Sequence, residues 1–179
     1  MPQPVPAVPQ IPAGWQPVQA DFTAWITNPF SFLAQPAGFR GQLQAAKALS
    51  GWTLAQLDTI LEDPYSGWSA VLTASQPAFS WLCPAGCAGW YEATVSGFTL
   101  NQASSAAQSA AALYLNGSVW QYGSDDWAVN GNDSGSSGAV QVPLIPGDYV
   151  QLYIYSTAAV NTPAVAGQYP ALEMTWVSS

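Results

Sequence analysis

Basic residues are nearly absent from this chain, and histidine is absent altogether. The only cations are Arg40 and Lys47, against ten acidic residues, so the formal net charge is −8. Affinity for a phosphate backbone comes from clustered Lys and Arg, so nucleic acid is not an expected partner. The lack of histidine removes the commonest general base, the commonest metal ligand and every Ser-His or Cys-His catalytic pair.

Long apolar runs and phosphate-binding glycine loops are missing as well. No stretch reaches the about 18 apolar residues of a membrane-spanning helix, so we expect no membrane association. The segment after Met1 lacks the basic and apolar regions of a secretory signal. Neither GxGxxG nor GxxxxGK[ST] occurs. We therefore expect no cofactor, no metal and no enzymatic activity.

Apolar and aromatic residues are abundant instead. Hydrophobic residues make up 49% of the 179 residues, charged residues only 7%, and there are nine Trp. So few charges are poorly suited to keeping an apolar surface dispersed in water. This composition fits a subunit that is packed against others. The length suits one domain of about 130–150 residues with an appendage.

The first 14 residues are dominated by proline, at positions 2, 4, 6, 9 and 12. This spacing disfavours helix and sheet and favours an extended polyproline-like arm. A disordered tail or linker is the alternative. We interpret residues 1–14 as a docking arm.

Residues 15–37 form a second segment that is rich in large apolar side chains. Asp21 can cap a short helix, which Asn28-Pro29 would end. The segment is too short to enclose a core of its own, so we expect it to be buried on the main domain or on a neighbour. The expected anchoring residues are Trp15, Phe22, Trp25, Ile26, Phe30, Phe32 and Leu33.

Residues 38–179 alternate between short strand patterns and turns, without intervening helices. This arrangement predicts an all-β antiparallel sandwich or jelly roll. Residues 39–46 are ambiguous between helix and strand, and 125–138 are predicted to be a loop. Asn116-Gly117 predicts a hairpin, which favours a strand over the helix that the alanines of 106–115 would suggest. The other expected strands are 52–60, 68–73, 78–82, 90–98, 119–122, 139–145, 149–155 and 173–177.

The strand after Pro146-Gly147-Asp148 carries large side chains on both faces. Val150, Leu152 and Ile154 alternate with Tyr149, Gln151, Tyr153 and Tyr155. The aliphatic face requires a sheet-on-sheet core. The tyrosine face suits an interface that is dry yet offers hydroxyl groups. Burial of both faces within one domain is the alternative.

Cys83 and Cys87 lie between two expected strands. With no other Cys and no His, they cannot complete a zinc site, and three intervening residues do not match a redox CxxC. A disulfide at the loop tip and two free thiols both remain possible interpretations.

Two further groups of polar residues could suggest chemistry. The oxygen-rich loop Asp125–Asp133 could bind a cation, but its spacing does not match an EF-hand and its Gly and Asn residues also suit plain turns. Glu62 with Asp63, and Glu92 or Glu173, could be proposed as a glycosidase pair, although nothing fixes two carboxyl groups at a working separation. The tryptophans that could stack on sugars are Trp68, Trp81, Trp120 and Trp127, which we interpret mainly as core and interface residues.

The order of several motifs across residues 38–179 resembles the C1q/TNF-like jelly-roll family. The matching stretches are Phe39-Arg40, Leu57-Asp58-Thr59, Phe79-Ser80-Trp81-Leu82-Cys83-Pro84, Gly89-Trp90-Tyr91-Glu92-Ala93, Leu113-Tyr114-Leu115-Asn116-Gly117 and Leu144-Ile145-Pro146-Gly147-Asp148-Tyr149-Val150. The resemblance implies a jelly roll and a homotrimer whose inner sheets meet on a threefold axis. Tyr149, Gln151, Tyr153 and Tyr155 then become candidates for the trimer interface.

The appendage is similar to the leader of virion structural proteins from phages of actinobacteria, through Trp15-Gln16-Pro17, Asp21-Phe22, Trp25 and Asn28-Pro29-Phe30-Ser31-Phe32-Leu33. This resemblance implies a capsid decoration, head fibre or spike, exposed on the particle and bound to virion proteins such as the major capsid protein. A minor tail protein that binds a receptor or a host-surface glycan is the alternative, and a cell-wall hydrolase is a third interpretation.

Overall fold

The computed structural model describes residues 36–99, 108–123, 126–127, 134–162 and 168–178. These residues form twelve strands and no helix. The strands are β1 (Gly38–Gln42), β2 (Ala48–Leu54), β3 (Thr59–Glu62), β4 (Trp68–Ser69), β5 (Ser80–Leu82), β6 (Gly89–Thr99), β7 (Gln108–Leu115), β8 (Ser118–Tyr122), β9 (Asp126–Trp127), β10 (Ser134–Leu144), β11 (Tyr149–Asn161) and β12 (Ala171–Ser178).

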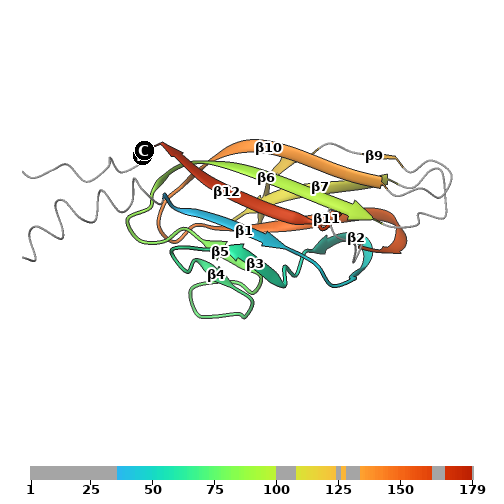
Figure 1. Ribbon diagram of the computed structural model, residues 1–179, viewed down its shortest axis with the longest axis horizontal. Helices are drawn as coiled ribbons and strands as arrows, with labels where there is room; N and C mark the ends of the chain where they lie inside the picture. The colour runs from blue at the N-terminus through green and yellow to red at the C-terminus, as the bar shows by residue number, and fades with distance from the viewer. Residues whose placement is uncertain (1–35, 100–107, 124–125, 128–133, 163–167, 179) are drawn as a thin grey trace, which may run out of the picture.

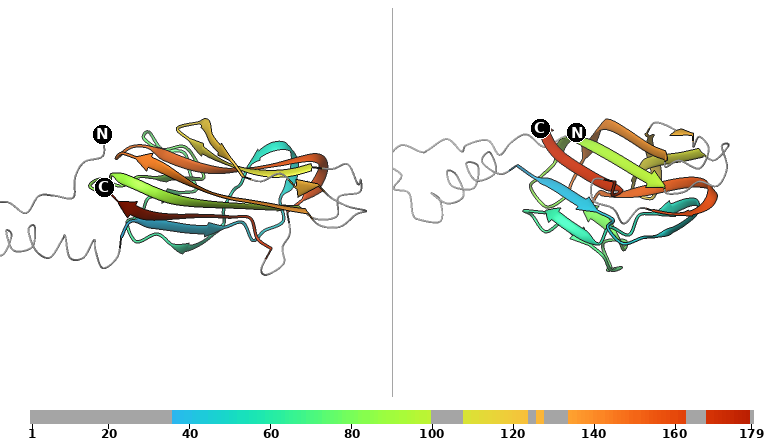
Figure 2. Two further views of the ribbon diagram at one scale, coloured as in Figure 1. Left: turned by 90° about the horizontal axis from the view of Figure 1, so that it is seen from above. Right: turned by 45° about the vertical axis from the view of Figure 1, so that its right-hand side comes forward.

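The strands form two antiparallel sheets that pack face to face (Figure 1). The five-stranded sheet has the order β10-β6-β12-β1-β3. The seven-stranded sheet has the order β4-β5-β11-β7-β8, with β2 also paired to β11 and β9 to β7. Figure 2 shows the same sandwich from above and from an oblique direction. The expected all-β antiparallel sandwich is confirmed.

The core lies between the two sheets and is aliphatic at its centre. Its buried residues include Val150, Leu152 and Ile154 on β11 and Val142 and Leu144 on β10. Aromatic rings fill the end near β4 and β5, where Phe39 stacks on Trp68 with ring centroids 5.1 Å apart and Trp81 meets the ring of Tyr91 at 5.5 Å.

Two turns place the central strands as their sequences predict. Asn116 and Gly117 both have positive φ, at 51° and 78°, which is the geometry of a tight hairpin between β7 and β8. Gly147 has φ 98° in the turn before β11, where the Asp148 N–H donates to Ile145 O at 3.0 Å. Both turns require backbone angles that Gly and Asn adopt at low cost.

The expected single strand 52–60 is wrong, because the chain changes sheets there. β2 pairs with β11 in the seven-stranded sheet, whereas β3 pairs with β1 in the five-stranded sheet. The residues between them cross from one layer to the other. The carboxylate of Asp58 holds the neighbouring loop by accepting hydrogen bonds from the N–H groups of Gln44 and Ala45 at 2.9 and 2.8 Å.

The structure also defines the strands in one ambiguous segment and in two segments whose expected bounds differ. The segment 39–46 is a strand only to Gln42, and 68–73 is a strand only over Trp68–Ser69. After Ser69 the chain turns, as the Ser69 hydroxyl donates to Val71 O at 2.8 Å. The expected loop 125–138 contains β9 and the first residues of β10. Its Gly and Ser residues still form a strand because the backbone of β6 pairs with β10 from Ser134 to Leu144.

Candidate interaction surface

The two faces of β11 have the environments that their side chains predict. Its aliphatic side chains lie in the core. Tyr149, Tyr153 and Tyr155 are half-buried on the opposite face of the seven-stranded sheet, while Gln151 is only 6% exposed. The Gln151 side-chain amide donates to Ala78 O at 3.1 Å, so this residue has a partner in its own chain. The assignment of these four residues to a trimer interface stays a prediction.

Rings from four neighbouring strands gather on this outer side of the seven-stranded sheet. We call them the aromatic face: Trp52 on β2, Tyr114 on β7, Tyr122 on β8, and Tyr153 and Tyr155 on β11. Trp52 lies 5.1 Å from Tyr155 and 5.5 Å from Tyr122, centroid to centroid. Tyr114 stacks on Tyr153 at 4.0 Å with an interplanar angle of 28°.

Two small residues explain how these rings meet. Ala110 and Ala112 alternate with core residues, so their methyl groups point away from the core, yet Ala112 is 0% exposed. In the strand register Ala112 lies between Tyr153 on β11 and Tyr122 on β8, and Ala110 lies beside Tyr155. The rings therefore lie over the alanines. The Ala-rich composition of β7 makes room for a second aromatic layer outside the core.

The aromatic face is apolar, uncharged and partly open to solvent. The four strands β2, β7, β8 and β11 contain no Asp, Glu, Lys or Arg. Trp52 is 37% exposed and Tyr122 is 54% exposed. Burial raises the pKa of Tyr114, and Tyr122 and Tyr153 raise it further, so its hydroxyl stays neutral at ordinary pH. Such a face favours an uncharged partner that can pack on rings and accept hydroxyl hydrogen bonds.

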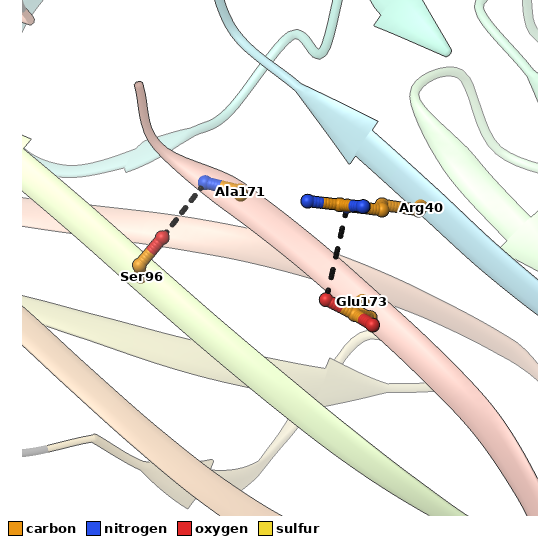
Figure 3. Close-up of polar contacts among 4 residues, drawn as sticks. All are labelled: Arg40, Ser96, Ala171 and Glu173. Carbon is orange, nitrogen blue, oxygen red and sulfur yellow. Dashed lines mark hydrogen bonds and ion pairs between the residues drawn. The ribbon is translucent and has the colours of Figure 1, made fainter. Parts of the chain in front are cut away.

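The outer side of the five-stranded sheet has a different chemistry. Arg40 on β1 lies between Glu62 on β3 and Glu173 on β12 in the strand register. Figure 3 shows the Arg40–Glu173 ion pair, with Nε and Oε2 3.8 Å apart, and the Ala171 N–H donating to the Ser96 hydroxyl at 3.1 Å. Exposed Glu92 and Thr94 continue this polar surface along β6.

Two of the four acids proposed for glycoside hydrolysis lie at the same pocket. Glu62 and Glu173 line one pocket of about 160 Å³ beside Pro36 and Met174, but both are exposed and Arg40 lies between their strands. Asp63 is used structurally, accepting hydrogen bonds from the N–H groups of Gly67 and Trp68.

Cys83 and Cys87 are buried free thiols in this structure. The Cys83 Sγ lies 3.4 Å from Cys87 O, and the Tyr91 hydroxyl donates to that same carbonyl at 2.6 Å. Burial raises the pKa of Cys83 to about 12 and also raises the pKa values of Cys87 and Tyr91. The disulfide between Cys83 and Cys87 stays a prediction.

The four tryptophans that could stack on sugars lie in different environments. Trp68 and Trp81 pack in the core, and Trp120 turns toward β10, where its Nε1–H donates to Gln141 O at 3.3 Å. Trp127 lies in β9 beside Gln108.

Most of the Asp125–Asp133 loop and all seven anchoring residues lie outside the described residues. Within the described part of the chain, no group of three potential ligands is placed to hold a metal ion, and no helix could span a membrane.

Sequence reasoning missed the residues that complete the aromatic face. Trp52, Tyr114 and Tyr122 were placed on strands but given no role at the surface. Their neighbours across the sheet come from segments distant in sequence, as in the pair Trp52 and Tyr155. The one usable signal was Ala110 and Ala112, because two alanines on an outward face leave space for rings from adjacent strands.

Comparison with known proteins identifies the fold. No family model and no curated protein sequence matches the chain. The globular domain of zebrafish complement 1qA superposes with a TM-score of 0.55 at 12% identity, covering 79% of this chain and 97% of that one. Murine APRIL superposes with a TM-score of 0.55 at pH 5.0 and 0.52 at pH 8.0, at 9% and 10% identity, covering 79% of this chain and 98% of each APRIL chain. The protein therefore has the all-β, antiparallel C1q/TNF-like jelly-roll fold.

Proposed function

We propose that this chain is a structural protein of a bacteriophage virion, a homotrimeric capsid decoration or spike. Its apolar N-terminal segment, residues 15–37, binds other virion proteins such as the major capsid protein, and the jelly roll projects from the particle. Its work is mechanical, because burial of apolar surface between subunits holds the assembly together.

The observation that carries this proposal is the uncharged aromatic face. Five rings gather on strands without a single charge, and Trp52 and Tyr122 remain partly exposed. Large partly exposed apolar patches mark surfaces that bind partners. We propose that in the trimer this face contacts a second copy, through Tyr149, Tyr153 and Tyr155 together with Trp52 and Tyr122. Gln151, already bonded to Ala78, keeps the centre of the face in place.

The arrangement of the chain ends supports anchoring at one end of the sandwich. β1 begins beside the end of β12, with Gly38 paired to Thr175. In Figure 1 the start of β1 and the end of β12 lie at the same end of the long axis. A segment that precedes Pro36 enters the domain there, so an anchor formed by residues 15–37 leaves the opposite end free to project.

The trimer is tested by measuring the mass of the full-length protein with light scattering. We expect three copies per particle, and a shift to monomer in Tyr155→Lys, because a buried unpaired ammonium is strongly unfavourable. Thr94→Lys is the matched control, since Thr94 is exposed on the five-stranded sheet. A wild-type monomer would refute the trimer. If only Thr94→Lys dissociates it, the contact lies on the other sheet.

The virion role is tested by sedimentation with phage particles that lack this protein. We expect the full-length chain to bind them and a Trp25→Ala, Phe32→Ala double variant to stay in solution, with the trimer mass unchanged. Binding by the double variant equal to that of the wild type would contradict the anchoring role of residues 15–37.

Glycan recognition by a tail protein is the second candidate function, and the exposed rings of Trp52 and Tyr122 favour it. Aromatic rings offer flat surfaces on which sugars stack. Glycan-array binding that is lost in Tyr122→Ala but kept in Trp120→Ala would support adhesion. Binding to no glycan would remove this candidate and leave the structural role unaffected.

A further inference from the structure

We propose that residues 1–14, the proline-rich arm, of one copy lie across the aromatic face of the neighbouring copy in the trimer. This inference rests on the proposed trimer and names the segment that the neighbour contributes to the contact. It also divides the N-terminal region into two parts, with residues 15–37 binding the virion and residues 1–14 joining the subunits.

The chemistry of the aromatic face matches a polyproline-like segment. Prolines in an extended left-handed helix pack on aromatic rings, and their backbone carbonyls, which have no internal hydrogen bonds, accept from Tyr and Trp groups. The face supplies aromatic rings and hydrogen-bond donors, in the stacked pair Tyr114–Tyr153 and in the rings of Trp52, Tyr122 and Tyr155. Because proline is already restricted, little conformational entropy is lost on binding.

Neither the proline-rich arm nor the strands of the aromatic face carry a charged side chain. Residues 1–14 contain five prolines and no Asp, Glu, Lys or Arg side chain. The strands β2, β7, β8 and β11 contain no charged side chain either. No charged side chain would therefore lose its hydration without a partner when the two pack together. The outer side of the five-stranded sheet, with Glu62, Arg40, Glu92 and Glu173, would impose that cost.

The chain between the arm and the domain is long enough to reach a neighbour. Residues 15–36 span up to about 70 Å when fully extended. The 13 residues of β11, the longest strand, span about 43 Å. The arm can therefore pass beyond the length of one sandwich. Tethering within a trimer raises its effective concentration to about the millimolar range, so a modest intrinsic affinity suffices.

The test is photo-cross-linking in the full-length protein, with benzoylphenylalanine replacing Val8. We expect irradiation to give covalent dimers in which the label is joined to peptides of β2, β8 or β11, identified by mass spectrometry. A label at Leu72, 77% exposed in the loop between β4 and β5, is the control and should give none of these products. An excess of synthetic peptide 1–14 should lower the yield of cross-linked dimer.

Matched variants show whether the rings hold the arm. Loss of one aromatic contact worth about 1 kcal/mol corresponds to roughly a fivefold lower yield, expected for Tyr122→Ala. Trp120→Ala, on the same strand but with its ring directed to Gln141 O, should leave the yield unchanged. Circular dichroism confirms that both variants are folded.

The outcomes separate this inference from the function on which it rests. Trimers whose Val8 label reaches other parts of the molecule, or nothing, would overturn the arm contact and leave the trimer standing. Cross-links only within one chain would overturn the exchange between copies. A monomeric wild type would overturn both proposals.

Discussion

The indole Nε1–H of Trp81, a fully buried tryptophan, donates to the carboxylate of Asp63 at 3.2 Å. The same carboxylate accepts from the N–H groups of Gly67 at 2.9 Å and Trp68 at 2.9 Å. One side chain thus connects the loop after β3 with β4 and β5. Gly67 is needed there because a Cβ atom would lie 2.5 Å from Leu82 O.

Asp63→Ala should lower the free energy of unfolding by about 2 kcal/mol or more, since it leaves three donors without their acceptor. Urea denaturation followed by tryptophan fluorescence measures this. Glu62→Gln, one residue earlier and exposed, is the control and should change stability by less than about 0.5 kcal/mol. Equal effects of the two variants would show that the Asp63 carboxylate does not hold the loop.

Asn116 should be sensitive to replacement for two separable reasons. It has φ 51°, and its side chain donates to Asp148 at 2.8 Å and accepts from the Tyr149 N–H at 3.0 Å. Both Asn116→Gly and Asn116→Ala lose the side-chain hydrogen bonds, but only alanine keeps a Cβ in the left-handed region, at a cost of about 1 kcal/mol relative to glycine. Thermal unfolding should therefore rank wild type above Asn116→Gly, and Asn116→Gly above Asn116→Ala. An alanine variant as stable as the glycine variant would contradict this geometry.

Cys83 should react slowly with iodoacetamide in the folded protein. Burial raises the pKa of its thiol from 9.0 to about 12, so the reactive thiolate is scarce at pH 8. Mass spectrometry should show little alkylation in buffer and rapid alkylation of both cysteines in urea. Fast modification of Cys83 under native conditions would mean that the loop between β5 and β6 opens readily.

Stability should fall at alkaline pH. An acidic group whose pKa is higher in the folded than in the unfolded state stabilises the fold at pH values below its unfolded-state pKa. This stabilisation is lost as the pH rises from the unfolded-state pKa to the folded-state pKa. For Cys83 that window runs from 9.0 to about 12, and the raised pKa values of Cys87 and Tyr91 act in the same direction. Denaturant midpoints measured between pH 8 and pH 11 should decrease, and Cys83→Ala should reduce the slope. An unchanged slope in that variant would assign the effect to other groups.

Ala112→Leu should destabilise the protein by about 1–3 kcal/mol, because Ala112 is fully buried beneath the rings of the aromatic face. The larger side chain would separate Tyr122 from Trp52, so near-ultraviolet circular dichroism should change as well. Ser118→Leu, at an exposed position on β8, is the control. A tolerated Ala112→Leu with an unchanged spectrum would show that the rings do not lie over this methyl group.

The sequence alone determined features that depend on neighbouring residues. Alternation along β11 predicted which side chains enter the core, and Asn116-Gly117 and Pro146-Gly147 predicted the turns, because these signals arise from backbone geometry within a few residues. The motif order also indicated the jelly-roll fold. The prediction of a single strand over 52–60 was wrong because a continuous local pattern does not reveal that its two halves pair with strands of different sheets.

Only the tertiary structure decided what meets across the sheets. It placed Ala110 and Ala112 beneath rings from β2, β8 and β11, and it set Arg40 between Glu62 and Glu173. These neighbours are far apart in sequence, and strand pairing between distant segments is set by the packing of the whole domain rather than by local preference. The aromatic face is therefore a property of the folded chain, composed of residues that no local pattern connects.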